Sequence, residues 1–348
     1  MKKLTLNVGK KYDILIEKNL LDNCGKLIRE VSKAKKAGII TDSNVGLFYA
    51  ERVKESLEKE GFEVFIHIFR AGEQSKNFES IYRMLCFLAE NTFTRSDIVV
   101  ALGGGVTGDM AGFTAASYMR GIDFVQIPTS LLAQIDSSVG GKTGVDLPQG
   151  KNLCGAFWQP RRVIIDPEVL STLPKAFFTD GMAEAIKAGC IKDKALFERL
   201  EKENAPDFIE DMIYSCVDMK RKVVENDERE KGERMLLNFG HTLGHAIEKY
   251  YDFKGLSHGQ AVAVGMVLVT RASEKAGITE KGTTERLIEL IKKYGLPFED
   301  KAELAELLKI TRSDKKMSNS GLNFVMLKEI GESFTKPLTV EQTEEFFS

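Results

Sequence analysis

Residues 97–112 read DIVVALGGGVTGDMAG, and this stretch decides the fold class. A short apolar run, typical of a buried strand, passes through three glycines into a segment with helical spacing. Gly103, Gly105 and Gly108 satisfy GxGxxG, a pattern in which the backbone approaches a pyrophosphate and a helix N-terminus offers unpaired N–H groups. A tight structural turn would show the same glycines, and Asp109 near the helix start could simply oppose the helix dipole. The turn alone therefore leaves nucleotide binding and a structural role equally open.

Further strands are predicted on both sides of this turn, with helices such as 48–60 and 77–91 between most of them. The apolar runs lie at 37–41, 62–68, 98–102, 122–127 and 163–165. A hairpin of 4–8 and 12–16, with Gly9 in its turn, precedes them. Strand–helix–strand alternation at this spacing predicts a mostly parallel sheet covered by helices.

The second half of the chain is predicted to be helical, so the fold class is α/β followed by all-α. The helical segments are 181–200, 208–226, 236–250, 258–276, 281–294 and 301–310, and 322–328 is the one late strand candidate. Glycine, proline and other turn residues gather at 140–174. We therefore place an α/β domain at 1–165 and a helical domain at 166–348.

Composition excludes several classes of protein. The chain has 348 residues, with 49 Lys+Arg against 51 Asp+Glu, and this near-neutral balance argues against a general nucleic-acid surface. Its apolar stretches are too short to span a bilayer, and residues 1–20 do not resemble a secretory signal. The five scattered cysteines form no CxxC, which predicts reduced thiols in a cytoplasmic protein.

Polar turns follow two of the predicted strands. Thr41-Asp42-Ser43-Asn44 follows one, and Pro128-Thr129-Ser130 follows another. In an open α/β sheet, ligands bind at the carboxyl ends of the strands. These turns and the glycine turn could therefore line one cleft, which favours nucleotide binding.

Three of the four histidines fall within 18 residues, which points to a divalent metal. His241 and His245 share one face of a helix, and His258 begins the next helix. Adjacent imidazoles suit a divalent ion, and Thr242 replaces the glutamate that a zincin protease needs. An oxygen ligand is also expected, and spacing leaves Asp180, Glu184 and Glu248 open as candidates. His67, isolated in an alternating strand, is predicted to have no such role.

Residues 134–158 are long, glycine-rich and polar, and we expect an irregular functional segment. Its lysines beside glycines suit a phosphate or a carboxylate. Other cationic candidates are Arg120, Lys187, Lys220, Arg234, Lys315 and Lys316.

Taken together, these segments resemble the 3-dehydroquinate synthases of the sugar-phosphate cyclase family. The resemblance rests on 103–121 (GGGVTGDMAGFTAASYMRG), 128–152 (PTSLLAQIDSSVGGKTGVDLPQGKN), 155–160 (GAFWQP), 181–189 (GMAEAIKAG), 236–248 (LLNFGHTLGHAIE), 257–266 (SHGQAVAVGM), and DKK followed by FVMLKEIG at 314–331. The motifs occur in the family order and cover nearly the whole chain, so the match is far more specific than a glycine pattern.

The resemblance implies a Rossmann-like NAD-binding domain and a helical metal-binding domain, with the active site between them. It implies a zinc ion, with cobalt as an alternative, held by Glu184, His241 and His258. His245 then handles a proton or the substrate beside the metal. It also implies a homodimer in which Arg120 completes the partner's active site.

The resemblance further assigns residues to the cofactor and to the substrate. For NAD they are Asp42, Asn44, Glu73, Lys76, Gly104, Gly105, Val106, Asp109, Thr129, Ser130, Lys142, Lys151 and Thr172. For catalysis and substrate they are His245, Lys142, Asp136, Lys187, Asn152, Arg234, Lys220, Glu230, Asn238, Arg120 and Lys315.

The implied substrate is 3-deoxy-D-arabino-heptulosonate 7-phosphate. NAD would oxidise a hydroxyl transiently, phosphate would leave, the ketone would be reduced back, and an aldol step would close the ring. Two residues depart from the family pattern: Gln260 stands for a usual glutamate, which would weaken tuning of the metal, and Ser130 stands for a threonine. Alternatives are a related cyclase for another sugar, a metal-dependent polyol dehydrogenase, and a non-catalytic NAD sensor.

Overall fold

The computed structural model describes residues 1–314 and 321–347. The chain divides into two compact units, the first running from Met1 to Pro174 and the second beginning at Lys175. The predicted boundary after residue 165 therefore falls inside the first unit.

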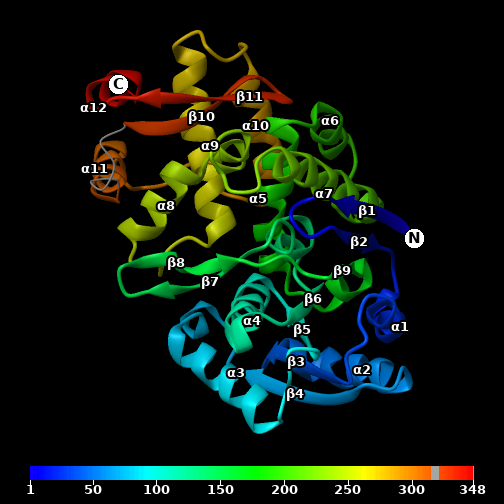
Figure 1. Ribbon diagram of the computed structural model, residues 1–348. Helices are drawn as coiled ribbons and strands as arrows, with labels where there is room; N and C mark the ends of the chain where they lie inside the picture. Colours follow the sequence, from blue (N-terminus) through cyan, green and yellow to red (C-terminus); the bar gives the residue numbers. More distant parts are fainter. Residues whose placement is uncertain (315–320, 348) are drawn as a thin grey trace. The chain divides into compact units, whose positions relative to one another are not determined.

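A mostly parallel sheet forms the centre of the first unit, as predicted (Figure 1). Among the described residues its order is β1-β2-β9-β6-β5-β3-β4. The strands are β1 (Lys2–Leu6), β2 (Tyr12–Ile16), β3 (Lys36–Asp42), β4 (Glu63–Phe69), β5 (Ile98–Gly103), β6 (Asp123–Pro128) and β9 (Arg162–Ile165). β1 and β2 form the predicted antiparallel hairpin, and every other neighbouring pair is parallel.

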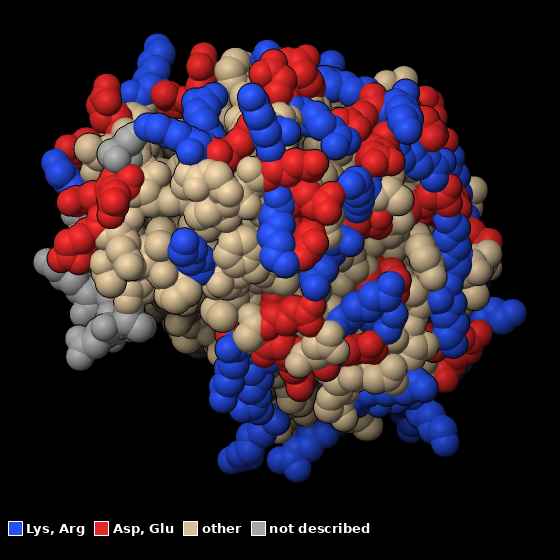
Figure 2. All heavy atoms as spheres, turned by 90° about the horizontal axis from the view of Figure 1, so that it is seen from above, with Lys and Arg blue, Asp and Glu red and all other residues tan. Residues whose placement is uncertain are grey.

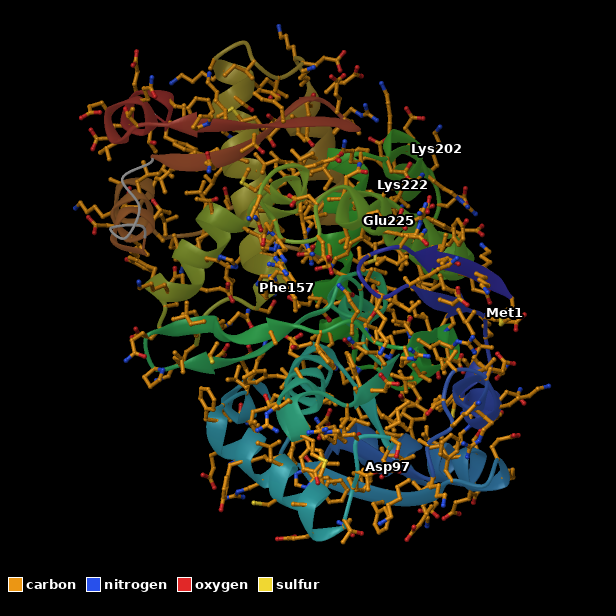
Figure 3. The ribbon with its side chains drawn as sticks, in the orientation of Figure 1. Met1, Asp97, Phe157, Lys202, Lys222 and Glu225 are labelled. Carbon is orange, nitrogen blue, oxygen red and sulfur yellow. The ribbon has the colours of Figure 1, made fainter. Side chains whose placement is uncertain are left out.

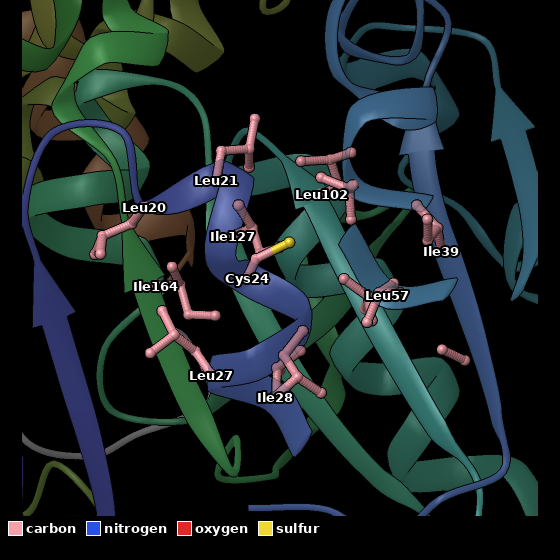
Figure 4. Packing of buried hydrophobic residues seen from close by; sticks show 14 of the residues in the cluster. Leu20, Leu21, Cys24, Leu27, Ile28, Ile39, Leu57, Leu102, Ile127 and Ile164 are labelled. Atoms are coloured by element: carbon pink, nitrogen blue, oxygen red, sulfur yellow. The ribbon is translucent and has the colours of Figure 1, made fainter. Parts of the chain in front are cut away.

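Helices cover both faces of this sheet, because successive strand side chains point to opposite sides. They are α1 (Cys24–Arg29), α2 (Val45–Lys59), α3 (Phe78–Glu90) and α4 (Gly105–Ser117). Ile39 packs with Leu57 of α2 in the core that Figure 4 shows. Its chain neighbour Ile40 packs in the opposite core with Met84 of α3 and Ala111 of α4. The sheet is thus buried on both faces, which explains why its strands are continuous apolar runs.

Most of the segment 134–158, predicted to be irregular, forms a two-stranded ribbon, so the prediction of irregular structure is wrong there. β7 (Lys142–Leu147) pairs antiparallel with β8 (Gly150–Phe157). Gly144 lies opposite Gly155, and a Cβ on Gly155 would lie 1.9 Å from the carbonyl oxygen of Thr143. Glycines that allow this close approach also remove the alternation by which a strand is recognised.

The second unit is mainly helical, as predicted. Its helices are α5 (Lys175–Ile191), α6 (Lys194–Lys202), α7 (Ile209–Asn226), α8 (His241–Tyr250), α9 (His258–Lys275), α10 (Thr283–Lys293), α11 (Leu304–Asp314) and α12 (Val340–Phe347). The helix predicted at 181–200 is two helices, because Asp193 accepts a hydrogen bond from the N–H of Leu196 and starts α6. The helix predicted from 236 begins at His241, after Gly240 with φ +78°.

The late strand is confirmed, but it has a partner that the sequence did not indicate. β10 (Leu322–Glu329) pairs antiparallel with β11 (Glu332–Leu338). β11 reads ESFTKPL, and its proline and charged residues hide it from an apolar pattern.

Positive and negative side chains are interspersed over much of the face shown in Figure 2, in line with the near-neutral composition. None of the helices in the described ranges is long and apolar enough to cross a membrane.

Candidate metal centre and nucleotide-binding turn

Three turns meet at one edge of the sheet in the first unit. β3, β5 and β6 are parallel neighbours, so their carboxyl ends lie side by side. The N–H of Thr129 donates to the carbonyl oxygen of Gly103 at 3.0 Å, which joins the turn after β6 to the glycine turn. The structure therefore brings together the polar and glycine-rich turns that the sequence singled out.

Asp42 organises the end of β3. One carboxylate oxygen accepts from the N–H groups of Asn44 at 2.8 Å and Val45 at 3.1 Å, at the start of α2. The other accepts from the hydroxyl of Thr107 on α4 at 3.3 Å. Thr107 was not predicted, and it ties the helix after the glycine turn to the neighbouring strand.

Glycine in this turn is explained by the close approach of neighbouring atoms and not by a positive φ angle. Gly104 has φ −74°, and Gly105 is not among the residues with positive φ. A Cβ on Gly105 would lie 3.1 Å from the hydroxyl of Ser137. Glycine therefore allows the start of α4 to pack closely against Ser137, and a helix N-terminus suits an anion such as a pyrophosphate.

A buried charged network lies beside this turn. Lys76, 5% exposed, contacts the carboxylate of Asp109 at 2.7 Å and the amide oxygen of Asn152 at 2.5 Å. Burial lowers the pKa of Lys76, but Asp109 and Glu73 outweigh this and raise it overall. Burial also raises the pKa of Glu73 above its ordinary value. These four residues, all predicted for cofactor or substrate, form one cluster.

The other predicted residues of the first unit lie on several different elements. Lys142 begins β7, Lys151 lies in β8, and Asp136 lies in a π-helical turn at 133–137. Val106 lies in the first turn of α4, and the hydroxyl of Ser130 accepts from the N–H of Ala133. The hydroxyl of Thr172 contacts that of Tyr49 at 2.7 Å, and Arg120 has φ +67°.

A candidate metal centre lies in the second unit, where three helices bring Glu184 (α5), His241 (α8) and His258 (α9) together. An oxygen of Glu184 is 3.5 Å from Nε2 of His241 and 3.8 Å from Nε2 of His258. Ligands about 2.0–2.1 Å from a tetrahedral ion are about 3.3 Å apart. The observed spacings therefore fit a shared divalent ion better than direct hydrogen bonds.

The chemistry of the donors also fits a metal. Both carboxylate oxygens of Glu184 are buried, and the ammonium of Lys187 forms an ion pair with one of them. The other oxygen, which faces the two imidazoles, accepts no hydrogen bond from the described residues. Burial, and then Lys187, hold the pKa of His241 well below its ordinary value. A neutral imidazole is the form that binds a metal.

The structure separates the three acidic candidates that spacing left open. Asp180 accepts from the N–H of Gly259 at 2.7 Å and from the hydroxyl of Ser257, so it caps the start of α9. Glu248 contacts the other nitrogen of His258, Nδ1, at 3.4 Å. Glu184 faces two Nε2 atoms and is therefore the best oxygen ligand.

Gln260 takes part in a capping box at the start of α9. Its amide oxygen accepts from the N–H of Ser257 at 3.0 Å, immediately before His258. Glutamine keeps the acceptor oxygen that this bond requires, so the exchange of glutamate for glutamine preserves the capping contact.

Small residues set the spacing between α8 and α9. A Cβ on Gly265 would lie 2.1 Å from the carbonyl oxygen of Gly240, and one on Gly244 would lie 3.1 Å from the backbone of Val262. These glycines let the backbones of α8 and α9 pack closely, and the ring centroids of His241 on α8 and His258 on α9 are 5.2 Å apart.

The remaining predicted residues of the second unit lie on α7 and in the segment after it. Arg234 is 1% exposed and donates to the carbonyl oxygen of Glu228, and Lys220 on α7 is 7% exposed. Asn238 donates to Glu230 at 2.9 Å. Lys315 and Lys316 lie outside the described residues.

The sequence did not indicate Asp227, which organises this segment. Its carboxylate accepts from the N–H groups of Lys231 at 2.9 Å, Gly232 at 2.6 Å and Arg234 at 3.1 Å. These bonds, that of Lys231 first, lower the pKa of Asp227. Aspartate before a glycine-containing loop is the signal that could have revealed it.

A polar cavity of about 610 Å³ borders α7, and Lys222 and Glu225, labelled in Figure 3, line it. It contains none of the metal-centre residues. His67, predicted to have no functional role, stacks against the ring of Phe87 at 5.2 Å.

Comparison with known proteins identifies relatives over the whole chain. Family models match residues 66–180, described as "3-dehydroquinate synthase N-terminal", and 181–317, described as "3-dehydroquinate synthase C-terminal". The 3-dehydroquinate synthase of Clostridium botulinum is 48% identical over 347 residues, covering 98% of this chain and 99% of the relative. That of Clostridium perfringens strain 13 is 51% identical over 350 residues, with the same coverage.

Solved structures of related cyclases share the fold. 2-Deoxy-scyllo-inosose synthase, complexed with carbaglucose-6-phosphate, NAD+ and Co2+, has a TM-score of 0.88 at 25% identity and covers 99% of both chains. An iron-containing alcohol dehydrogenase has a TM-score of 0.66 at 17% identity over 98% of both chains. The second similarity shows the fold alone.

Proposed function

The chain belongs to the 3-dehydroquinate synthase family, and we propose how its own residues divide the work of that reaction. The protein is an enzyme that converts 3-deoxy-D-arabino-heptulosonate 7-phosphate into 3-dehydroquinate and phosphate, a step of the shikimate pathway to aromatic amino acids. The single observation that carries the proposal is the buried Glu184 carboxylate facing two imidazoles, in a chain about half identical to these synthases.

NAD and a divalent metal, zinc or cobalt, are the cofactors, as in the bound structures of related cyclases. When bound, NAD accepts and returns a hydride, and the metal polarises hydroxyl and carbonyl oxygens of the substrate. Because the hydride is returned within each turnover, the enzyme needs no second redox substrate.

In the first unit, the glycine turn and the polar turns beside it bind the cofactor. The N–H groups at the start of α4 receive the pyrophosphate, and the carboxylate of Asp42 orders the neighbouring turn. The ammonium group of Lys76 is held in position by Asp109 and Asn152, and we assign it to the binding of the cofactor. We assign Glu73, Thr129, Ser130, Lys151 and Thr172 to the same cofactor role.

In the second unit, Glu184, His241 and His258 hold the metal, and His245 moves a proton beside it. His245 is exposed, and its ring centroid lies 5.5 Å from that of His241, so it is accessible to substrate near the metal. A neutral imidazole can accept the proton of the hydroxyl that is oxidised.

Cationic and amide side chains bind the carboxylate and phosphate of the substrate. We assign Lys142, Asn152, Lys187, Lys220, Arg234, Asn238 and Lys315 to this role, with Asp136 and Glu230 orienting their neighbours. Asn238 is already held by Glu230 at 2.9 Å.

Phosphate release tests the function directly. The purified enzyme should release phosphate from the heptulosonate, should lose this activity with a metal chelator, and should accumulate no NADH. Glucose 6-phosphate and sedoheptulose 7-phosphate serve as controls for other cyclases. Preference for either control sugar would contradict the substrate assignment, and stoichiometric NADH would indicate a polyol dehydrogenase.

We also propose that the enzyme is a cytoplasmic homodimer in which Arg120 reaches the partner's active site. The positive φ of Arg120 places it in a strained turn directly after α4, and such strain often marks a functional residue. All five cysteines are free thiols, in keeping with a reducing compartment. Light scattering at micromolar concentration would measure the oligomeric state. A monomer that is fully active at that concentration would contradict the proposed dimer.

A further inference from the structure

Glu248 lies outside the Glu184–His241–His258 group but contacts one of its histidines. On α8 it follows His241 by seven residues and His245 by three, so all three share one helix face. Its side chain is 3% exposed, and its carboxylate lies 3.4 Å from Nδ1 of His258. The opposite nitrogen of that ring, Nε2, faces Glu184 at 3.8 Å. The imidazole of His258 therefore lies between two carboxylates from two different helices.

This arrangement fits the way proteins orient a metal-binding imidazole. A histidine that binds a metal through Nε2 carries its proton on Nδ1, and that N–H needs an acceptor. A carboxylate in this position fixes the ring orientation and makes the ligand more basic. A buried carboxylate is also costly unless it is paired, so Glu248 gains from the same contact. The backbone at His258 is fixed separately, because Asp180 caps α9.

An alternative interpretation of this arrangement is that Glu248 binds a second metal ion. Ligand atoms of His245, Glu248 and His258 also lie within 4.8 Å of one another. In that case His258 would have to bind through Nδ1 while Nε2 serves the Glu184 group, which requires loss of both ring protons. Accepting the Nδ1–H of a neutral imidazole requires no such loss, so the first reading is favoured.

We propose that Glu248 is a positioning residue that accepts the Nδ1–H of His258 and thereby strengthens metal binding at Glu184, His241 and His258. This inference rests on the proposed function for the presence of a metal at that group. It assigns Glu248 to the orientation of a ligand and not to the reaction itself.

Zinc affinity of the purified protein, measured by competition with a chromophoric chelator, tests this role without relying on activity. Glu248→Ala should weaken zinc binding about 10–100-fold, the usual cost of losing such a partner. Glu248→Gln keeps an acceptor oxygen and should weaken it less. Glu289→Gln is the matched control, since Glu289 is exposed on α10 and forms an ion pair with Lys292 of the same helix. It should bind zinc as the wild type does.

Two further measurements separate positioning from a general effect on folding. The visible absorption spectrum of the cobalt-loaded Glu248→Gln protein should shift at full cobalt occupancy, because the ligand field changes. Thermal unfolding of the zinc-free variants should match that of the zinc-free wild type. A loss of zinc affinity that only mirrors a loss of zinc-free stability would overturn the proposal.

The remaining outcomes distinguish this inference from the function on which it rests. Tight zinc binding by the wild type with unchanged affinity in Glu248→Ala would overturn the role of Glu248 alone. Two zinc ions in the wild type and one in Glu248→Gln would make Glu248 a ligand of a second ion. A wild-type protein that binds no zinc would overturn the metal centre itself.

Discussion

Gly265→Ala should damage the metal centre from a distance, through the packing of α8 on α9. An alanine Cβ at this position would lie 2.1 Å from the carbonyl oxygen of Gly240. Carbon and oxygen normally approach to about 3.3 Å, so the two backbones must separate by about 1 Å. Gly240 directly precedes His241, and Gly265 lies on the helix that begins with His258. The separation therefore moves one imidazole away from the other.

The size of this movement decides the expected result. Metal–ligand distances are tolerated within about 0.2 Å, which is well below the forced shift. We expect the zinc affinity to fall at least about tenfold. Overpacking should also lower the free energy of unfolding by about 1–3 kcal/mol, partly offset by the better helix propensity of alanine.

Zinc stoichiometry and chelator competition on the purified variant measure the first effect, and urea unfolding of the zinc-free protein measures the second. Gly277→Ala is the control, because Gly277 follows the same helix with φ +69° and has no atom within 4 Å of an added Cβ. It should cost about 1–2 kcal/mol of backbone strain while leaving zinc binding intact. Wild-type zinc affinity in Gly265→Ala, or an equal loss in Gly277→Ala, would refute the reasoning.

Three further predictions address the proton handler, the nucleotide turn and the segment after α7. His245→Ala should keep its zinc and bound NAD but lose about 10²–10⁴-fold in turnover, as measured by metal analysis beside a phosphate-release assay; a zinc-free variant would make His245 a ligand. Gly105→Val should abolish NAD binding in calorimetry, because its side chain would crowd Ser137 at the turn where the protein backbone is proposed to approach the pyrophosphate, and unchanged NAD affinity would refute this placement. Asp227→Asn should destabilise the protein at neutral pH, because the backbone N–H groups of Lys231, Gly232 and Arg234 lower the pKa of Asp227 in the folded state. That stabilisation is complete above the unfolded pKa of about 3.9 and is lost as the pH falls through the folded value, so the urea midpoints of variant and wild type should converge in acid; a difference that grows on acidification would contradict it.

The sequence alone determined the elements whose patterns are local. Continuous apolar runs separated by helical stretches predicted the parallel sheet, because a strand buried on both faces needs apolar residues at successive positions. The spacing of His241 and His245 predicted a shared helix face, because that face recurs every 3.6 residues. The glycine turn after β5 and the polar turns after β3 and β6 were also predicted locally, because glycine and short polar residues directly follow apolar runs.

Residue spacing left the acidic neighbour of the imidazoles open and the family resemblance implied Glu184, but only the tertiary structure gives the physical reason for the choice. Glu184 lies on a helix far along the chain from α8 and α9, and Asp180 lies just one turn away from it. The two carboxylates differ in what surrounds them after packing: backbone N–H groups for Asp180 and imidazole nitrogens for Glu184. The ribbon of β7 and β8 escaped prediction for a related reason, since its glycines are explained only by the opposing strand. Contacts between segments distant in sequence leave no periodic pattern in either segment, and so they become visible only when the chain is folded.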